Sequence, residues 1–251
     1  MRKLSVIISA FMLCLTMTAC GSGEPASAPN VAENDKSVVQ EKLNKTESKT
    51  DNAATAGDDK HSETTEPPAE KTEEQTSEST NILVAYFSRA DENYSVGTIE
   101  VGNTQILGEY IANEVGADSF HIETVTPYPT GYDECCDIAK QEQNDNARPE
   151  LNGSVENMEQ YDIVFLGYPI WWGDMPMAVY TFMESYDWSD KVVIPFCTHE
   201  GSGLSGTDSN IANALPDAQV LTAIDMRGST AQALNDDTKQ TVRTWLDDLG
   251  F

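Results

Sequence analysis

The sequence predicts an α/β fold, in which a five-stranded parallel sheet of strand order 2-1-3-4-5 carries helices on both faces. All four Trp and all nine Tyr lie within residues 81–251, so a single hydrophobic core is expected there. In the same region five apolar runs of strand length alternate with helical segments. Right-handed crossovers between such strands produce an open parallel sheet with ligands at the carboxyl ends of its strands.

The first elements are well marked. Residues 81–87 form a continuous apolar run, which is typical of a central parallel strand because such strands are buried on both faces. Residues 104–115 have apolar side chains at helical spacing and end before Gly116, a usual helix terminator. We expect the second strand at residues 118–125 and a helix at residues 132–146.

The rest of the chain repeats the alternation of strand and helix. We expect strands at residues 162–167, 191–196 and 219–224, and helices at residues 177–186, 210–215 and 234–249. The first, third and fourth strands each run into a loop of unusual composition, so chemistry is expected where these loops meet.

Residues 1–20 have the pattern of a bacterial export signal. An apolar run over residues 4–15 follows two basic residues and is too short to span a bilayer. It ends in Met17-Thr-Ala-Cys20, which resembles the lipobox of bacterial lipoproteins. The resemblance implies that Cys20 is lipidated and anchors the chain to the extracytoplasmic face of the cell membrane. A plain cleaved signal is the alternative.

Residues 21–80 are predicted to be a disordered acidic linker. They are rich in Glu, Thr, Ser and Lys and contain few large apolar residues, so they cannot bury enough surface to offset the entropy of ordering. As a flexible coil the segment would span roughly 40 Å. We therefore expect it to hold the domain of residues 81–251 off the membrane.

The charge of the chain limits its partners. The formal net charge is −27 at pH 7, which repels nucleic acid and anionic lipid headgroups. Contact with the membrane is therefore expected only through the lipid anchor. The same field favours redox partner proteins with basic surfaces, although high charge also serves solubility alone.

Cysteine and histidine form no metal site by spacing. Cys135, Cys136 and Cys197 are an odd number without regular spacing, so they are no disulfide framework. The adjacent pair would form a strained vicinal disulfide, and we expect reduced thiols on a helix instead. No His/Cys cluster has the spacing of a zinc site.

The first loop is predicted to hold a phosphate group. It runs from Ser88-Arg89 to Gly102-Asn103-Thr104, where a helix begins. Free backbone N–H groups and the dipole at a helix start favour an anion, and Ser88, Asn103 and Thr104 add side-chain donors. The alternative is that Asn103 or Thr104 only caps the helix. The chain has no Gly-x-Gly-x-x-Gly or Walker sequence for a dinucleotide or nucleoside triphosphate.

The second loop contains two adjacent tryptophans, in Pro169-Ile170-Trp171-Trp172-Gly173. Both cannot easily be buried at the end of a strand, and aromatic rings of this kind hold flat ligands by stacking. Gly173 lets the backbone approach a ligand closely and change conformation at low cost.

The third loop is rich in glycine and small polar residues. Gly201 and Gly203 let the backbone bend around a planar ring, and Thr198 and Ser202 supply donors. His199 either orders the loop or takes part in redox chemistry. The sequence Gly201-Ser202-Gly203 lacks the spacing of a serine hydrolase.

Together these loops resemble the bacterial flavodoxin family. The resemblance covers residues 81–251 and rests on Tyr86-Phe-Ser-Arg89, Gly102-Asn-Thr104, residues 161–173 and residues 194–203. It implies a flavodoxin-like fold and non-covalently bound FMN, with the phosphate on the first loop and the ring between the other two. The sequence differs from well-studied flavodoxins by an insertion over residues 90–101 and by the absence of Tyr from the third loop.

The resemblance implies an FMN-binding electron carrier tethered to the outer face of the cytoplasmic membrane. An FMN-dependent reductase of quinones or similar small acceptors is the alternative function. The inserted residues 90–101 would decide between them, since they either build a substrate pocket beside the ring or close it.

Overall fold

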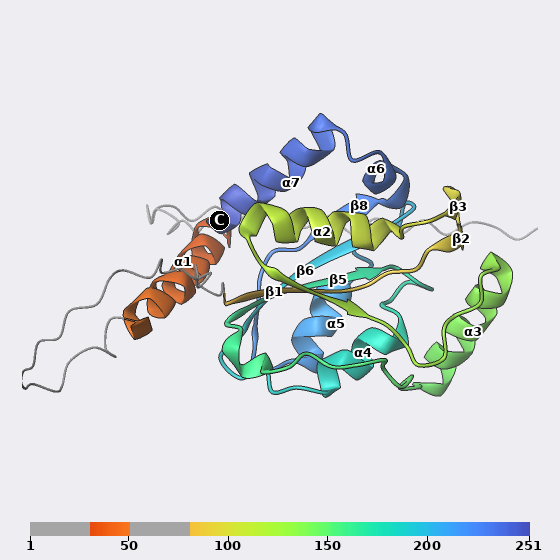
Figure 1. Ribbon diagram of the computed structural model, residues 1–251, viewed down its shortest axis with the longest axis horizontal. Helices are drawn as coiled ribbons and strands as arrows, with labels where there is room; N and C mark the ends of the chain where they lie inside the picture. Colours follow the sequence, from red (N-terminus) through yellow and green to blue (C-terminus); the bar gives the residue numbers. More distant parts are fainter. Residues whose placement is uncertain (1–30, 51–80) are drawn as a thin grey trace, which may run out of the picture.

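The computed structural model describes residues 31–50 and 81–251, with the side chains of residues 45–50 left out (Figure 1). The predicted signal over residues 1–20, the lipidation at Cys20 and the linker segments 21–30 and 51–80 lie outside the described residues. Among the helices of the described ranges, none has the length and apolar character needed to cross a membrane.

The main sheet is parallel and has the strand order β4-β1-β5-β6-β7, with β8 also paired to β6. The predicted order 2-1-3-4-5 is confirmed. Its strands are β1 (Ile82–Phe87), β4 (Asp118–Ile122), β5 (Ile163–Pro169), β6 (Val192–His199), β7 (Gln219–Val220) and β8 (Ile224–Arg227).

The predicted fifth strand over residues 219–224 is two short strands, β7 and β8. The chain leaves the sheet between them at Thr222, whose backbone N–H donates to the carboxylate of Asp35. An acceptor outside the sheet therefore replaces a ladder bond at this position.

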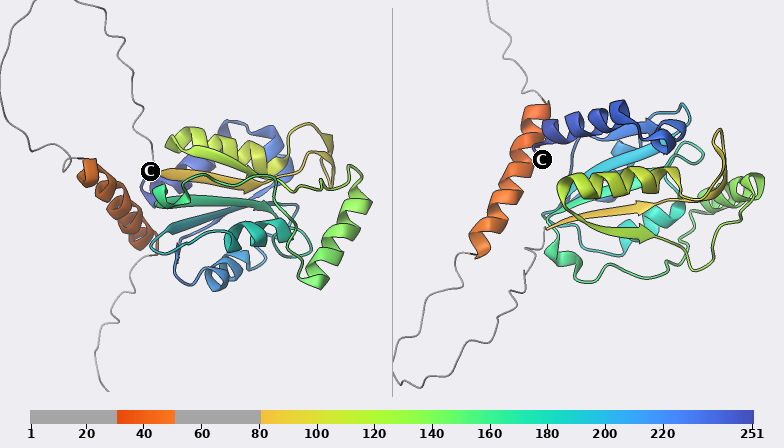
Figure 2. Two further views of the ribbon diagram at one scale, coloured as in Figure 1. Left: turned by 60° about the horizontal axis from the view of Figure 1, so that its bottom comes forward. Right: turned by 45° about the horizontal axis from the view of Figure 1, so that its top comes forward.

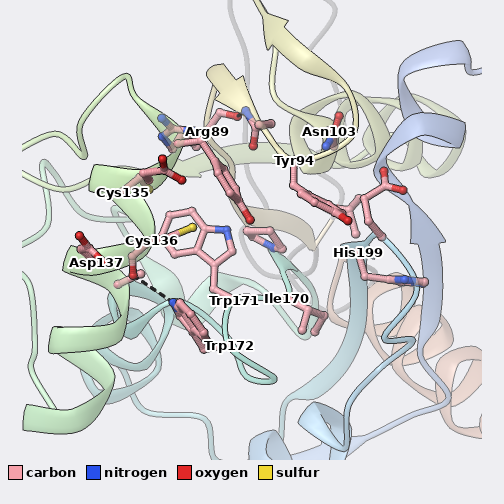
Figure 3. Close-up of a pocket in the computed structure, with 17 residues that line it drawn as sticks. Arg89, Tyr94, Asn103, Cys135, Cys136, Asp137, Ile170, Trp171, Trp172 and His199 are labelled. Carbon is pink, nitrogen blue, oxygen red and sulfur yellow. Dashed lines mark hydrogen bonds between the residues drawn. The ribbon is translucent and has the colours of Figure 1, made fainter.

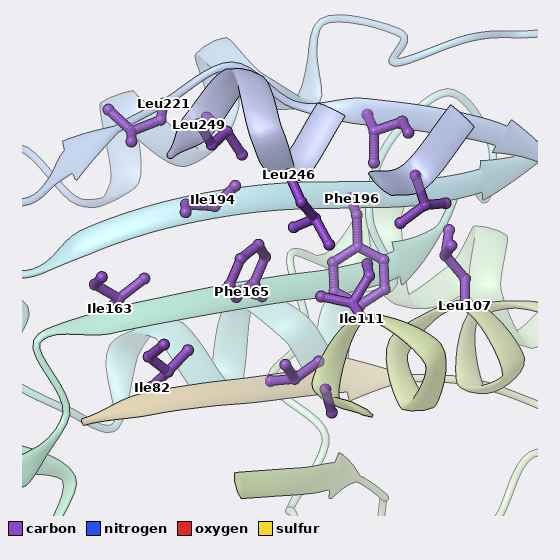
Figure 4. Close-up of a cluster of buried hydrophobic side chains, with 14 of the residues drawn as sticks. Ile82, Leu107, Ile111, Ile163, Phe165, Ile194, Phe196, Leu221, Leu246 and Leu249 are labelled. Atoms are coloured by element: carbon purple, nitrogen blue, oxygen red, sulfur yellow. The ribbon is translucent and has the colours of Figure 1, made fainter. Parts of the chain in front are cut away.

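Two hydrophobic layers cover the sheet because successive side chains of a strand point to opposite faces. In β1, Ile82, Val84 and Tyr86 enter one core, and Leu83 and Ala85 enter the other. The first core lies under α2 (Asn103–Val115), α6 (Gly228–Ala233) and α7 (Asp236–Leu249), and Figure 4 shows its side chains. The second lies under α4 (Met177–Glu184) and α5 (Thr207–Ala214), near the short 3₁₀ helix Met158–Gln160.

Two further elements stand at the carboxyl ends of the strands. Helix α3 (Tyr132–Asp145) lies beyond the strand ends and on neither face of the sheet (Figures 1 and 2). The inserted residues 90–101 contain an antiparallel hairpin of β2 (Asp91–Asn93) and β3 (Gly97–Ile99). Both elements therefore belong to the edge where a ligand is expected.

The prediction of disorder for residues 21–80 is wrong for residues 31–50. They form helix α1 (Val31–Thr50), which packs against α7 at the opposite end of the sheet from α3 (Figure 2). The buried side of α1 includes Asp35 as well as Val39, so its apolar periodicity is too weak to identify from the sequence.

Candidate functional site

A pocket of about 670 Å³ opens at the carboxyl edge of the sheet (Figure 3), and its size is that of a typical ligand site. All three predicted loops contribute to its lining. The predicted site residues that line it are Arg89, Asn103, Pro169, Ile170, Trp171, Trp172, Thr198 and His199. The predicted residues outside the lining are Ser88, Gly102, Thr104, Gly173, Gly201, Ser202 and Gly203.

The start of α2 presents free donors at the first loop. Gly102 is the N-cap and has no side chain that could cap the helix, so the alternative in which Asn103 or Thr104 is the cap is wrong. Ser88 Oγ accepts a hydrogen bond of 3.0 Å from the backbone N–H of Gln105. Within the described ranges, nothing accepts a hydrogen bond from the backbone N–H of Asn103 or Thr104. Two unsatisfied N–H groups at the positive end of a helix dipole make an anion site.

Gly102 is required here for space. A Cβ atom at this position would lie 2.6 Å from the carbonyl oxygen of Arg89 and closer still to Ser88 Oγ. Its φ of −67° is open to any residue, so the close approach of the loop alone demands glycine. The close packing of Gly102 against Ser88 thus shapes the first loop, although neither residue lines the pocket.

Asn103 and Thr104, two of the predicted side-chain donors, have different roles. The Asn103 side chain lines the pocket, and its Oδ1 accepts a 2.9 Å hydrogen bond from Gln232 Nε2 on α6. Gln232 was missed because its distant helix carries no local signal. Thr104 Oγ1 lies 2.7 Å from Thr198 Oγ1, and both residues are buried. Thr104 therefore joins the first loop to the third and does not face a ligand.

Arg89 holds the wall of the pocket together. Its guanidinium donates to the carbonyl oxygens of Pro129, Thr130 and Glu92, at 2.6, 2.6 and 2.5 Å. These carbonyls belong to the hairpin and to the loop before α3. A planar cation with several donors is suited to this role, so Arg89 positions the inserted hairpin against α3.

The two tryptophans of the second loop have different environments. Trp171 is half-buried and packs edge-on against Phe87 and Tyr128, with ring centroids 5.3 and 5.2 Å apart. Trp172 is 54% exposed, and its Nε1–H donates to the Cys136 carbonyl oxygen at 3.0 Å. The expectation that both rings cannot be buried is confirmed.

The second loop turns tightly between Trp171 and Asp174. Their backbones exchange hydrogen bonds of 2.8 and 3.1 Å across the turn. Trp172 and Gly173 both have positive φ, +52° and +78°, as in a type I′ turn. A large side chain in this conformation costs about 1–2 kcal/mol, so Trp172 stores backbone strain at the rim of the pocket.

His199 orders the third loop. Its Nδ1 accepts a 2.7 Å hydrogen bond from the backbone N–H of Gly201, so the neutral ring carries its proton on Nε2. Nε2–H donates a hydrogen bond to Asp225 Oδ2 at 2.8 Å. Both ring nitrogens are engaged within the protein. Of the two roles considered for His199, this geometry supports the ordering of the loop.

Glu200 brings a carboxylate to the lining. It accepts a 2.7 Å hydrogen bond from the Ser229 backbone N–H and lies 3.8 Å from Arg227 Nη1. Asp174, by contrast, is turned under the second loop, where it accepts hydrogen bonds from Tyr180 and Asn210. Glu200 is therefore the carboxylate of these two that faces a ligand.

Apart from Glu200, the hairpin and α3 supply the residues of the lining that the sequence does not predict. The Tyr94 and Tyr132 rings lie 6.0 Å apart and form part of this wall. Burial and a hydrogen bond to Cys136 raise the pKa of Tyr132 to about 12, so its phenol remains a donor at neutral pH. The other residues of this wall are Asn93, Asp133, Cys135, Cys136, Asp137 and Ala139.

Cys135 and Cys136 are free thiols on α3, as expected. Burial raises the pKa of Cys135 to about 11, which keeps it protonated and unreactive. Within the ranges that the structure describes, no group of three or more His, Cys, Asp or Glu side chains is placed to hold a metal ion.

The pocket fits a flat ligand that carries a phosphate. Free N–H groups of Asn103 and Thr104 lie at the α2 start, and the Asn103 amide lies beside them in the lining. The aromatic rings of Trp171 and Tyr94 provide apolar surface in the same pocket. This arrangement suits a ligand with an anion at one end and a planar ring at the other.

Comparison with known proteins shows the family of the chain. A family model described as flavodoxin matches residues 81–249. A solved structure from Bacteroides eggerthii with a provisional flavoprotein assignment is 30% identical, with a TM-score of 0.54, over 68% of this chain and 98% of that one. A second, from Bacteroides uniformis, is 24% identical, with a TM-score of 0.53, over 66% and 99%.

A flavoprotein of Lactobacillus acidophilus, solved in complex with FMN, is 18% identical, with a TM-score of 0.48, over 62% of this chain and 98% of that one. Among proteins of curated function, none matches the chain. The family model covers most of the chain and coincides with its parallel sheet and three converging loops. The chain therefore belongs to the flavodoxin family.

Proposed function

We propose that this protein is an FMN-binding electron carrier, tethered by a lipid at Cys20 to the outer face of the cytoplasmic membrane. The observation that carries the proposal is the convergence of three loops on one pocket with an anion site at the start of α2. When bound there, FMN supplies one- and two-electron redox chemistry.

The residues of the pocket have distinct parts in this function. The backbone N–H groups of Asn103 and Thr104 and the Asn103 amide bind the phosphate. Trp171 provides apolar surface for the ring and limits its contact with water. Glu200 adds a carboxylate to the lining at the start of α6, where the Ser229 N–H and Arg227 bind it.

The membrane tether rests on the sequence alone. The apolar run before Met17-Thr-Ala-Cys20 has the form of a lipoprotein signal. Two acyl chains on a diacylglycerol suffice for stable anchoring. The net charge of −27 favours partner proteins with basic surfaces.

The experiment is a titration of the purified protein with FMN and, separately, with riboflavin. Because the site is expected to bind the phosphate, FMN should bind at least about tenfold more tightly. Equal affinities would contradict the assignment of the α2 start. Fractionation of cells that express the protein or its Cys20→Ala variant tests the anchor, since only the variant should leave the membrane.

The wall of the hairpin and α3 favours a second candidate, a reductase of quinones or similar small acceptors. Tyr94 and Tyr132 extend the pocket beyond the three loops and offer aromatic surface to a planar molecule. Oxidation of NAD(P)H by the FMN-loaded protein, with and without a quinone, separates the candidates. Rapid turnover supports the reductase, and its absence with photoreducible FMN supports the carrier.

A further inference from the structure

Helix α1 is attached to the domain along one side. Val39 is fully buried in the core cluster that also contains Leu249, and Asp35 is only 5% exposed. Val38 and Leu43 pack partly buried against the same cluster. These positions follow the spacing i, i+3, i+4 and i+8, which places them on one face of a helix. Residues 31–44 are therefore part of the folded domain.

The buried Asp35 makes this attachment specific. Its Oδ2 accepts hydrogen bonds from the backbone N–H of Thr222 at 2.9 Å and from Thr222 Oγ1 at 2.6 Å. Thr222 lies between β7 and β8 and needs an acceptor outside the sheet. A buried carboxylate is tolerated only where hydrogen bonds replace its hydration, so this contact fixes where α1 sits.

Further hydrogen bonds join α1 to the end of α7. Lys36 Nζ donates to the Asp247 carbonyl oxygen at 3.1 Å, and Gln40 Nε2 donates to the Gly250 carbonyl oxygen at 2.5 Å. The last carbonyls of a helix lack partners within it and attract cations, so α7 offers acceptors at this place. Lys42 also donates to the carbonyl oxygen of Asp190, just before β6.

These contacts place α1 far from the pocket. Asp190 precedes β6, and the other end of the same strand carries Thr198 and His199 of the pocket lining. An eight-residue strand is about 25 Å long. Figure 2 shows α1 at one end of the molecule and α3 at the other.

The attachment of α1 also shortens the free chain between the lipid at Cys20 and the folded domain. Only residues 21–30 separate Cys20 from α1, and ten residues can span at most about 35 Å. If α1 were free, the chain from Cys20 to Asn81 could span about 210 Å. The domain itself is roughly 40 Å across. A docked α1 therefore determines which end of the domain is near the bilayer.

We propose that α1 docks the tether on the amino-terminal ends of the strands and so turns the pocket away from the membrane, toward a water-soluble redox partner. This inference rests on the proposed lipid anchor at Cys20. Docking of α1 depends only on its contacts with the rest of the domain. The docking of α1 and the lipid anchor at Cys20 can therefore be refuted separately.

The docking test is hydrogen exchange on the full chain. In the Asp35→Ala and Val39→Ala variants, backbone amides of residues 31–44 should exchange at least about tenfold faster than in wild type. Glu41→Ala, an exposed change on the same helix, is the matched control and should leave exchange unchanged. Unchanged amides in β1 and β5 show that the domain still folds. Exchange of residues 31–44 at the rate of a free peptide in wild type would overturn the proposal.

The orientation test uses the lipidated chain in vesicles whose headgroups carry a photoreactive crosslinker. In wild type we expect crosslinks to residues around Asp190 and Thr222, which contact α1, and none to the hairpin of residues 91–99. The doubly substituted Asp35→Ala, Val39→Ala protein should lose this bias. Crosslinks to the hairpin in wild type, or the same pattern in both proteins, would overturn the proposal. Release of the wild-type chain from vesicles would refute the anchor instead and leave the exchange result standing.

Discussion

The side-chain oxygens of Thr104 and Thr198 lie 2.7 Å apart in the buried interior between the first and third loops. One hydroxyl donates to the other, and in the described structure neither hydroxyl has another hydrogen-bond partner. The two loops that hold opposite ends of the proposed ligand are therefore joined by one hydrogen bond.

Thr104→Val should destabilise the fold by about 1–3 kcal/mol, because it leaves the Thr198 hydroxyl buried without a partner. The double variant Thr104→Val, Thr198→Val removes both hydroxyls and should recover most of that loss. Urea unfolding of wild type, both single variants and the double variant forms a complete cycle. Thr244→Val, at an exposed position of α7, is the control. Additive losses in the double variant would mean that the two hydroxyls do not depend on each other.

Asn103→Ala should weaken FMN binding by about ten- to a hundredfold, since it removes a side-chain donor to a charged group. Riboflavin binding should hardly change, because riboflavin lacks the phosphate. Gln232→Leu should act in the same direction but less strongly, through the lost hydrogen bond to Asn103 Oδ1. Asn113→Ala, on an exposed part of α2, the helix that begins at Asn103, is the control. Fluorescence titrations with both ligands measure the effect, and equal weakening of the two would refute the phosphate site.

The parts of the fold that depend on long apolar runs could be predicted from the sequence. β1 and β5 are buried on both faces, so their composition alone identifies them. The loops after them follow from the rule that the carboxyl ends of parallel strands meet. Elements held by polar contacts were missed. In α1 the carboxylate of Asp35 takes a position where an apolar side chain would have indicated burial.

The predicted site was incomplete for a similar reason. The helix over residues 132–146 was expected, but nothing in its local pattern places it beyond the strand ends and against the pocket. The sequence therefore does not identify Tyr132 and Cys136 as residues of the pocket. The insertion that contains Tyr94 is evident in the sequence, but the contacts that make its hairpin a wall are not: Arg89 binds carbonyls on both sides, and Glu92 bonds to Thr130 and Tyr132.

The thiols of the domain should react in a fixed order with iodoacetamide. Burial raises the pKa of Cys135 to about 11 and that of Cys197 to about 12, so few of these groups are thiolates at pH 8. Cys136 is half-buried at the pocket and should be labelled first. Bound FMN should protect Cys136 from labelling. Between pH 8 and pH 10 the labelling of Cys135 should accelerate by up to about a hundredfold, because its thiolate fraction rises tenfold per pH unit. Labelling of Cys197 in the folded chain as fast as Cys136 would contradict this order, and mass spectrometry resolves the three sites.

Gly173→Ala tests whether the turn of the second loop controls the bound cofactor. Gly173 has a φ of +78°, and a Cβ atom there would meet nothing within 4 Å, so the substitution changes only backbone strain. We expect a loss of about 1 kcal/mol in the free energy of unfolding. Because Trp172 is already strained beside it, the turn should relax toward another conformation and shift the midpoint potentials of bound FMN.

Gly153→Ala is the matched control for this substitution. Gly153 also has a positive φ, +101°, and open space around its Cα, but, unlike Gly173 beside Trp172, it adjoins no lining residue in the sequence. Both variants should therefore lose similar stability, and only Gly173→Ala should shift the potentials in a redox titration. If the potentials of the two variants match those of wild type, the turn at Trp172-Gly173 does not act on the cofactor. If both variants shift them equally, the effect comes from general destabilisation, and the turn has no special part in setting them.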